Sequence, residues 1–207
     1  MPKSSRKVAR GRPPRTDEQI AEMRAGIAAI AERLFRTEGY AAVSMRRIAA
    51  EAGCTPMTLY AYYDGKIDIL SHLWAGVFET VFTKLDALAA KHRDPTARLH
   101  AVALAYVNHW LKHVEHYRLV FMTEGVTQPD VSLFVAGSPI VPRFAVLLDP
   151  LTQALHAADK SEIKLKSDLL ICGLHGIAHN LITISAYPWS KPERLVATLI
   201  AGLLATR

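Results

Sequence analysis

Apolar residues recur at intervals of three and four along most of this 207-residue chain, the spacing of helices that bury one face. The clearest stripe consists of Ile20, Met23, Ile27, Ile30 and Leu34. The sequence contains neither the alternating pattern of a half-buried strand nor the self-similarity of a repeat protein. The pattern therefore predicts an all-α protein.

Short polar and glycine signals indicate where the first three helices begin and end. Residues 16–19 have the form of a capping box, and Gly39 would end the helix that they start. Ser44 is the N-cap candidate of a second helix, and Thr55, followed by a proline, is that of a third. Residues 63–65 then interrupt the chain before a longer helix.

The rest of the chain predicts a larger helical bundle. Its periodicity and its breaks favour helices over residues 66–92, 96–112, 116–123, 141–158, 167–186 and 192–205. Residues 124–139, rich in Gly, Pro and Val, are expected to form a loop. Half of the chain is hydrophobic, which supplies ample material for a core and argues against a disordered protein.

Positive charge is concentrated ahead of the first helix. The formal net charge is +6, and residues 1–15 hold six of the 25 Lys and Arg residues and no acidic residue. The 19 remaining basic residues match the 19 acidic ones, so the folded part is formally neutral. A basic arm beside a folded module favours a polyanion partner, nucleic acid before an acidic membrane. A merely solubilising tail is the alternative.

The cysteines and the apolar segments indicate a cytoplasmic protein. Cys54 and Cys172 lack paired spacing and no signal segment follows Met1, so we expect reduced thiols. Residues 169–190 carry no formal charge and are long enough to cross a bilayer. They contain histidines and a proline, however, and no basic cluster flanks one side, so a helix buried in a bundle or a subunit interface is favoured over a membrane partner.

Residues 44–66 carry the main functional signal, because a short helix, a tight turn and a second short helix form a helix-turn-helix. The second helix of such a pair enters the major groove of DNA. Thr58, Tyr60 and Tyr62 offer hydroxyl groups there, and Met57 offers an apolar contact for a thymine methyl. The arginine at position 46 adds charge for a phosphate or a guanine edge.

The same segment resembles the N-terminal signature of the tetracycline-repressor (TetR) family over residues 17–70. The matching pattern is Ser44-x-Arg46-x-Ile48-Ala49-x-x-Ala52-Gly53-x-Thr55-x-x-Thr58-Leu59-Tyr60-x-Tyr62-Tyr63-x-x-Lys66-x-x-x-Leu70. The resemblance implies an all-helical homodimer whose N-terminal helices bind an inverted-repeat operator. It also implies a C-terminal domain that dimerises and binds a small effector, which releases the DNA.

Carried over position by position, the resemblance implies roles for individual residues. Phosphate contacts fall on Ser44, Tyr60 and Lys66, and base contacts on Arg46, Met57, Thr58 and Tyr62, with Thr55 in the same DNA-binding set. Two departures matter. Met57 stands where many members have Gly, which changes the expected base preference, and Gly65 replaces a common Ser cap.

Two further stretches resemble known patterns. Arg10-Gly11-Arg12-Pro13 is similar to the core of an AT-hook, whose arginines enter a narrow minor groove; simple phosphate neutralisation by Arg10 and Arg12 is the alternative. Residues 113–121 and 174–178 resemble a branch of TetR C-terminal domains known for a Trp-His-Gly run. Leu174 replaces the Trp of that run.

Candidate ligand sites in the second half have plainer alternatives. An effector cavity is expected among Trp74, Phe78, Phe82, Tyr106, Trp110 and His113, although ordinary core packing explains the same residues. His109, His113 and His116 share a predicted helix face, as do His175 and His179. Because no Cys or carboxylate completes a set, packing is favoured over a metal, and no cofactor is expected. The sequence contains no nucleophile–base pair, phosphate-binding glycine loop or paired carboxylates, so we expect no enzyme.

These observations predict three regions: a basic arm (1–15), a helix-turn-helix domain (16–66) and an effector-binding and dimerisation domain (67–207). The neutral helices over residues 169–186 and 193–205 are expected to form the dimer interface. The expected function is a transcriptional regulator, a repressor rather than an activator, that binds double-stranded DNA as a homodimer. Its expected effector is small and hydrophobic or amphipathic. The alternative is a ligand- or metal-sensing helical protein without operator binding.

Overall fold

The computed structural model describes residues 16–155 and 159–205. All regular structure within these ranges is helical, which confirms the predicted all-α class. The chain divides into two compact units, Met1–Leu70 and Ser71–Arg207, and the division falls inside α4 (Lys66–Ala89).

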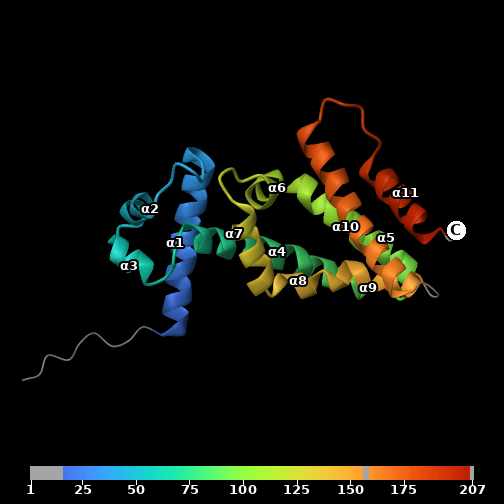
Figure 1. The fold of residues 1–207 in the computed structure, drawn as a ribbon, viewed down its shortest axis with the longest axis horizontal. Coiled ribbons are helices and arrows are strands. Elements are labelled where there is room, and N and C mark those ends of the chain that lie inside the picture. The colour runs from blue at the N-terminus through green and yellow to red at the C-terminus, as the bar shows by residue number, and fades with distance from the viewer. Residues whose placement is uncertain (1–15, 156–158, 206–207) are drawn as a thin grey trace, which may run out of the picture. The chain divides into compact units, whose positions relative to one another are not determined.

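The first unit contains α1 (Asp17–Glu38), α2 (Met45–Glu51) and α3 (Pro56–Tyr60), which are labelled in Figure 1. Thr16 and Gln19 form the predicted capping box of α1: the Gln19 backbone N–H donates to Thr16 Oγ1, and the Gln19 side chain accepts from the Thr16 N–H. Ser44 and Thr55 cap α2 and α3 in the predicted way. The sequence therefore located these three helix starts correctly.

The three helices pack around a small apolar core. Ala31 and Leu34 of α1, Ile48 of α2 and Leu59 of α3 are each no more than 1% exposed. The turn between α2 and α3 passes through Gly53, whose φ of 65° lies in the left-handed region that glycine adopts without strain. This turn sets α3 against α2.

The second unit continues α4 and adds seven helices along the described chain. They are α5 (Pro95–Lys112), α6 (Val114–Phe121), α7 (Gln128–Gly137), α8 (Ile140–Arg143), α9 (Ala145–Ala154), α10 (Lys160–Thr183) and α11 (Pro192–Leu204). α5 lies at the centre, because it packs against α9, α10 and α11. Seven of its residues are buried, among them Tyr106 and Trp110.

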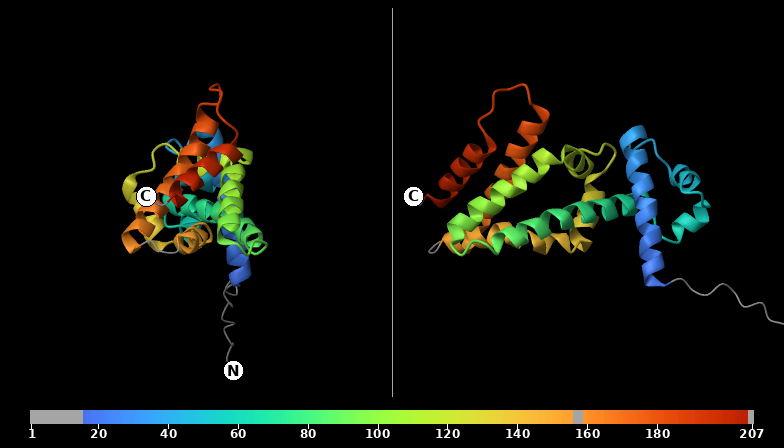
Figure 2. Two further views of the ribbon diagram at one scale, coloured as in Figure 1. Left: turned by 90° about the vertical axis from the view of Figure 1, so that its right-hand side faces the viewer. Right: turned by 180° about the vertical axis from the view of Figure 1, so that it is seen from behind.

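The last two helices form an antiparallel pair, side by side in both Figures 1 and 2. Gly173 allows their close approach, because a Cβ at this position would lie 2.6 Å from Cδ2 of Leu199. Leu174 and Ala178 of α10, and Ile200 of α11, are fully buried in the same core. The pair therefore belongs to the core on one side.

Three sequence predictions in this unit were wrong in detail. The expected loop over residues 124–139 contains α7, which starts with a capping box between Thr127 and Asp130. The expected helix over residues 141–158 is instead α8 and α9, which are separated at Phe144. α10 begins at Lys160 rather than residue 167, because Asp159 accepts a hydrogen bond from the Glu162 N–H and caps it.

Within the described ranges, no single helix is long and apolar enough to cross a membrane. The predicted candidate, residues 169–190, falls on the second half of α10 and on the turn that follows it. Among the described residues, only the helical stretches Gln128–Gly137 and Ile140–Ala154 together reach that length and composition, and they are bent by 73°.

Candidate DNA-binding surface and effector cavity

Local hydrogen bonds hold the candidate recognition helix α3 at its start. Thr55 Oγ1 accepts from the Thr58 backbone N–H at 3.1 Å, and the two threonine hydroxyls lie 2.9 Å apart. Pro56 occupies the first helical position, where its missing N–H has no intrahelical partner to lose. The cap thus orders a helix of only five residues before any partner binds.

The two faces of α3 differ sharply in exposure. Leu59 is fully buried, whereas Met57 is 84% and Tyr60 is 53% exposed. A thioether side chain with this much exposure buries little apolar area within the unit. Met57 and Tyr60 are therefore available to a partner, and Thr58 is half-buried between them.

Tyr62 does not share this exposure, which corrects the expectation that its hydroxyl reaches DNA. α3 ends at Tyr60, so Tyr62 lies in the turn that follows the helix and is only 6% exposed. Its carbonyl accepts a hydrogen bond from the Arg24 guanidinium, and the next hydroxyl, that of Tyr63, donates to the Arg24 carbonyl at 2.9 Å. Burial raises the pKa of Tyr63 to about 12. Both tyrosines anchor the end of α3 to α1.

Two neighbouring arginines at the start of α2 have different surroundings. Arg47 donates to Glu38 at 2.8 Å and to Glu51 at 2.7 Å, and these hydrogen bonds raise its pKa. Arg46 is exposed and enters no ion pair with the described residues. The charge of Arg47 is thus neutralised locally, whereas that of Arg46 is available to an anionic partner.

Lys66, a predicted phosphate contact, is held by two backbone carbonyls and a tyrosine ring. Its Nζ donates to the carbonyl oxygens of Tyr40 at 2.5 Å and Val43 at 2.9 Å, and it lies 4.2 Å from the centroid of the Tyr40 ring. Burial lowers its pKa. An ammonium group has three N–H donors, so one remains for a phosphate. Lys66 also joins the start of α4 to the loop before α2.

The other predicted DNA-binding residues divide by location. Ser44 is exposed, and its Oγ accepts from the Arg47 backbone N–H at 3.1 Å, so its hydroxyl proton remains available. Arg10 and Arg12 lie outside the described residues. The described part of the surface therefore consists of Ser44, Arg46, α3 and the remaining N–H of Lys66.

The second unit contains an apolar cavity of about 180 Å³. Aromatic and aliphatic side chains from α4, α6, α7 and α8 make most of its wall, and α10 contributes one histidine. The lining residues are Trp74, Phe78, Val120, Phe121, Val131, Phe134, Val135, Ile140, Val141, Phe144 and His175. Such a lining suits an apolar or amphipathic ligand.

His175 places a polar side chain in this apolar lining. Its Nε2 lies 2.7 Å from the hydroxyl of the buried Tyr106, whose ring stacks on the imidazole at a centroid distance of 5.7 Å. Burial lowers the pKa of His175 and raises that of Tyr106, so both groups are neutral at pH 7. The pair fixes the orientation of the imidazole beside the cavity.

Only two of the six residues expected around the effector line this cavity, namely Trp74 and Phe78. Phe82, Tyr106 and Trp110 are fully buried and belong to the core, the plainer alternative for them. His113 is also absent from the cavity wall. The contribution of α7 does not follow from the sequence pattern, which predicts a loop over residues 124–139. The capping box at Thr127 was the local signal that could have revealed it.

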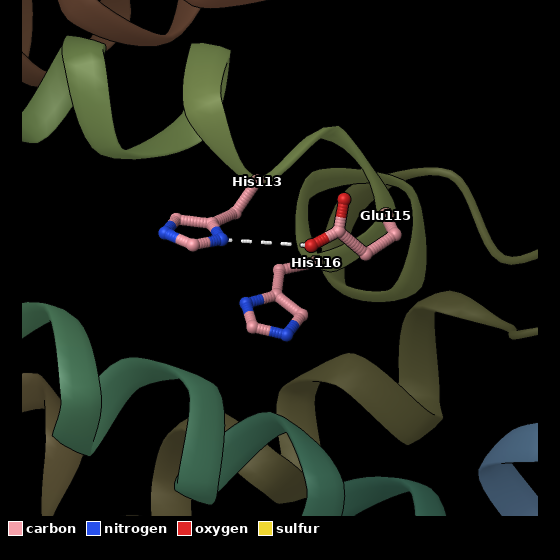
Figure 3. A group of neighbouring side chains, drawn as sticks. All are labelled: His113, Glu115 and His116. Carbon is pink, nitrogen blue, oxygen red and sulfur yellow. Dashed lines mark ion pairs between the residues drawn. The ribbon is translucent and has the colours of Figure 1, made fainter.

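His113 instead belongs to a side-chain cluster at the α5–α6 junction (Figure 3). The shared helix face expected for the three histidines does not exist, since α5 ends at Lys112 and His113 has φ −122° and ψ 62°. The break brings Glu115 beside His113, with a carboxylate oxygen 3.5 Å from Nδ1. A carboxylate therefore does complete the set, contrary to expectation. Burial lowers the pKa of the adjacent His109 to about 4.

An exposed recognition helix on a capped three-helix module defines the class of helix-turn-helix DNA-binding proteins. Residues 27–73 match the family model described as bacterial regulatory proteins of the tetR family. This match covers the N-terminal module, from within α1 into α4, and supports a DNA-binding regulator.

Solved structures share the fold over nearly the whole chain. The regulator FadR from Bacillus subtilis, in complex with stearoyl-CoA, superposes with a TM-score of 0.68 at 14% identity, covering 87% of this chain and 97% of that chain. The fatty acid degradation regulator FadR from Bacillus halodurans gives 0.66 at 16% identity, with 88% and 94% covered. The TetR-family regulator PfmR from Thermus thermophilus gives 0.58 at 16% identity, with 86% and 96% covered.

Proposed function

We propose that this protein is a homodimeric repressor that binds an inverted-repeat operator and is released by a small apolar or amphipathic effector. The observation that carries the proposal is the exposure of Met57 and Tyr60 on a capped helix whose opposite face, at Leu59, is fully buried. An ordered helix of this kind can enter the major groove without first folding.

The contacts divide into positioning and reading. Ser44 and Tyr60 would donate their hydroxyls to phosphates, and Lys66 would add its remaining N–H. Met57 would pack on a thymine methyl, Thr58 would reach a base edge, and the charge of Arg46 would meet a phosphate or a guanine edge. Thr55 contributes by capping α3. Arg10 and Arg12 would contact a flanking minor groove.

Dimerisation would proceed through α10 and α11. Leu165 and Leu169 on α10 are 60% and 48% exposed, and the exposed Cys172 follows at the next helical interval of three. These positions share one helix face, and a second copy of the chain would cover it. The two recognition helices would then read half-sites roughly 34–36 Å apart, about one turn of DNA.

The exposure of α10 also supplies a test of the dimer. Leu169→Lys should convert it to monomers, because charge on an apolar interface is costly to bury. Leu133→Lys on α7, where the leucine is 72% exposed, is the matched control and should leave the mass unchanged. Light scattering after gel filtration measures both. If the Leu169→Lys protein remained a dimer, α10 would not be part of the interface.

The effector would bind in the cavity between α4, α6, α7 and α10. Its volume of about 180 Å³ is smaller than the roughly 300 Å³ at which ligand pockets begin, so binding must widen it. α7 is the element suited to move, because none of its residues is buried. One of the similar regulators holds stearoyl-CoA, which is amphipathic. A ligand that prefers the widened state would weaken DNA binding by its differential affinity.

The fluorescent fatty acid cis-parinaric acid can probe this cavity. Val135→Trp should narrow it and weaken probe binding about tenfold or more, whereas Leu133→Trp on the same helix, outside the lining, should not. Fluorescence titration measures both affinities, and circular dichroism checks folding. Equal affinities for the two variants would exclude this cavity as the probe site.

Selection of bound duplexes from a random DNA pool tests the central proposal. The full-length protein should enrich an inverted repeat with half-sites one helical turn apart, and log affinity should fall linearly with log salt. Met57→Gly and Thr58→Ala should each change the enriched bases. The assignment of α3 as the recognition helix would be wrong if no inverted repeat were enriched, or if both variants enriched the same bases as the unchanged protein. Either result would favour a sensor without operator binding.

A further inference from the structure

The α5–α6 junction gathers metal-ligating side chains that neither the DNA-binding surface nor the cavity uses. His113 follows the last residue of α5, and Glu115 and His116 occupy the first turn of α6. Each offers one ligand atom, and the three atoms all lie within 4.8 Å of one another. We propose that His113, Glu115 and His116 bind a divalent transition-metal ion of the zinc class. Metal binding at this site would require neither the operator nor the effector.

The spacing is close to that of a coordination shell (Figure 3). His113 Nδ1 and a Glu115 carboxylate oxygen are 3.5 Å apart. Two ligands on a tetrahedral zinc ion, with bonds of about 2.0–2.1 Å, lie roughly 3.3 Å apart. The first edge of the tetrahedron is therefore nearly formed. The imidazole of His116 needs only a modest approach to complete a three-ligand face.

Unused ring nitrogens point to the same conclusion. His116 Nδ1 is buried without a hydrogen-bond partner in the described part of the protein. Nε2 of His109, whose ring centroid lies 4.7 Å from that of His113, is in the same situation. A buried polar atom without a partner costs free energy. A metal ion would accept the lone pair of such a nitrogen.

The ligand types restrict the ion. Two imidazoles and one carboxylate suit Zn²⁺ and related ions such as Co²⁺ and Ni²⁺, whereas Ca²⁺ and Mg²⁺ prefer shells of oxygen ligands. Three protein ligands leave a fourth position open. The site also begins the helix whose far end, Val120 and Phe121, lines the cavity. A bound ion would therefore fix one wall of that cavity.

Calorimetric titration of the full-length, untagged, metal-free protein with zinc sulfate tests the proposal. One ion per chain should bind, and Co²⁺ should give the visible absorption of a tetrahedral site. His116→Ala and Glu115→Gln should each weaken zinc binding about tenfold or more, since they remove a ligand. His92→Ala, a histidine outside the cluster, is the matched control and should bind zinc like the unchanged protein.

Unfolding temperatures separate a lost site from a lost fold. Without metal, the variants should melt near the unchanged protein, and added zinc should raise only the melting temperatures of the unchanged and His92→Ala proteins. The proposal is overturned if His116→Ala and Glu115→Gln bind zinc as tightly as His92→Ala. It is equally overturned if zinc binds no tighter than to an unrelated protein of similar histidine content. Neither measurement involves DNA, so its outcome is independent of the repressor proposal.

Discussion

The two units of this protein use opposite arrangements for their proposed functions. In the N-terminal unit the side chains proposed to contact DNA are exposed, and a buried residue lies one or two positions away in the sequence. Met57 and Tyr60, on either side of the buried Leu59, are the example. In the C-terminal unit the side chains proposed to bind the effector surround a cavity and come from segments as distant as Trp74 and His175. A recognition surface can thus be fixed by local spacing, whereas a cavity depends on how distant helices pack.

The largest effect on this comparison is expected from the buried side of α3. Leu59→Ala removes a fully buried side chain and should destabilise the N-terminal unit by about 2–5 kcal/mol, with loss of DNA binding. Binding of cis-parinaric acid in the other unit should persist. Met57→Ala, on the exposed face, should change stability by less than about 0.5 kcal/mol. Thermal unfolding measures the stability of both variants, and titrations with DNA and with cis-parinaric acid measure the two binding activities. Loss of cis-parinaric acid binding in Leu59→Ala would contradict the expectation that the cavity does not depend on α3.

A smaller effect is expected from two tyrosine hydroxyls. Tyr106→Phe leaves Nε2 of His175 without its partner at 2.7 Å and should lower the free energy of unfolding by about 1–3 kcal/mol. Tyr60→Phe, at an exposed position, should leave stability almost unchanged and weaken DNA binding instead. Denaturant unfolding and DNA titration of both variants provide the test. Equal stability losses would mean that the two tyrosines do not differ in role.

The smallest effect on stability distinguishes the adjacent arginines. Arg46→Ala should lower the salt dependence of DNA binding by about one unit of slope, because an available positive charge is lost. Arg47→Ala should keep the slope, since Glu38 and Glu51 already neutralise that charge, and should cost at most about 1 kcal/mol of stability. DNA titrations between low and physiological salt measure the slopes. A larger change of salt slope for Arg47→Ala than for Arg46→Ala would mean that Arg47, not Arg46, supplies the charge available to DNA.

The sequence was most informative where one residue and its near neighbours decide the structure. Thr16, Ser44 and Thr55 cap their helices as predicted, because an N-cap hydroxyl accepts from an N–H only three residues away. Pattern reading failed where distant groups decide. Tyr62 is buried because the chain turns after Tyr60 and is tied to α1 through Arg24. No residue close to Tyr62 in the sequence predicts its contact with Arg24.

By itself, the sequence determined that this protein is helical, where its first three helices begin, and which family its N-terminal module resembles. Only the tertiary structure decided the cavity wall and the two carbonyl partners of Lys66. The physical reason is the distance along the chain over which each interaction acts. Caps and turns involve atoms a few bonds apart, so short motifs specify them, whereas packing joins side chains whose separation along the chain carries no periodic signal.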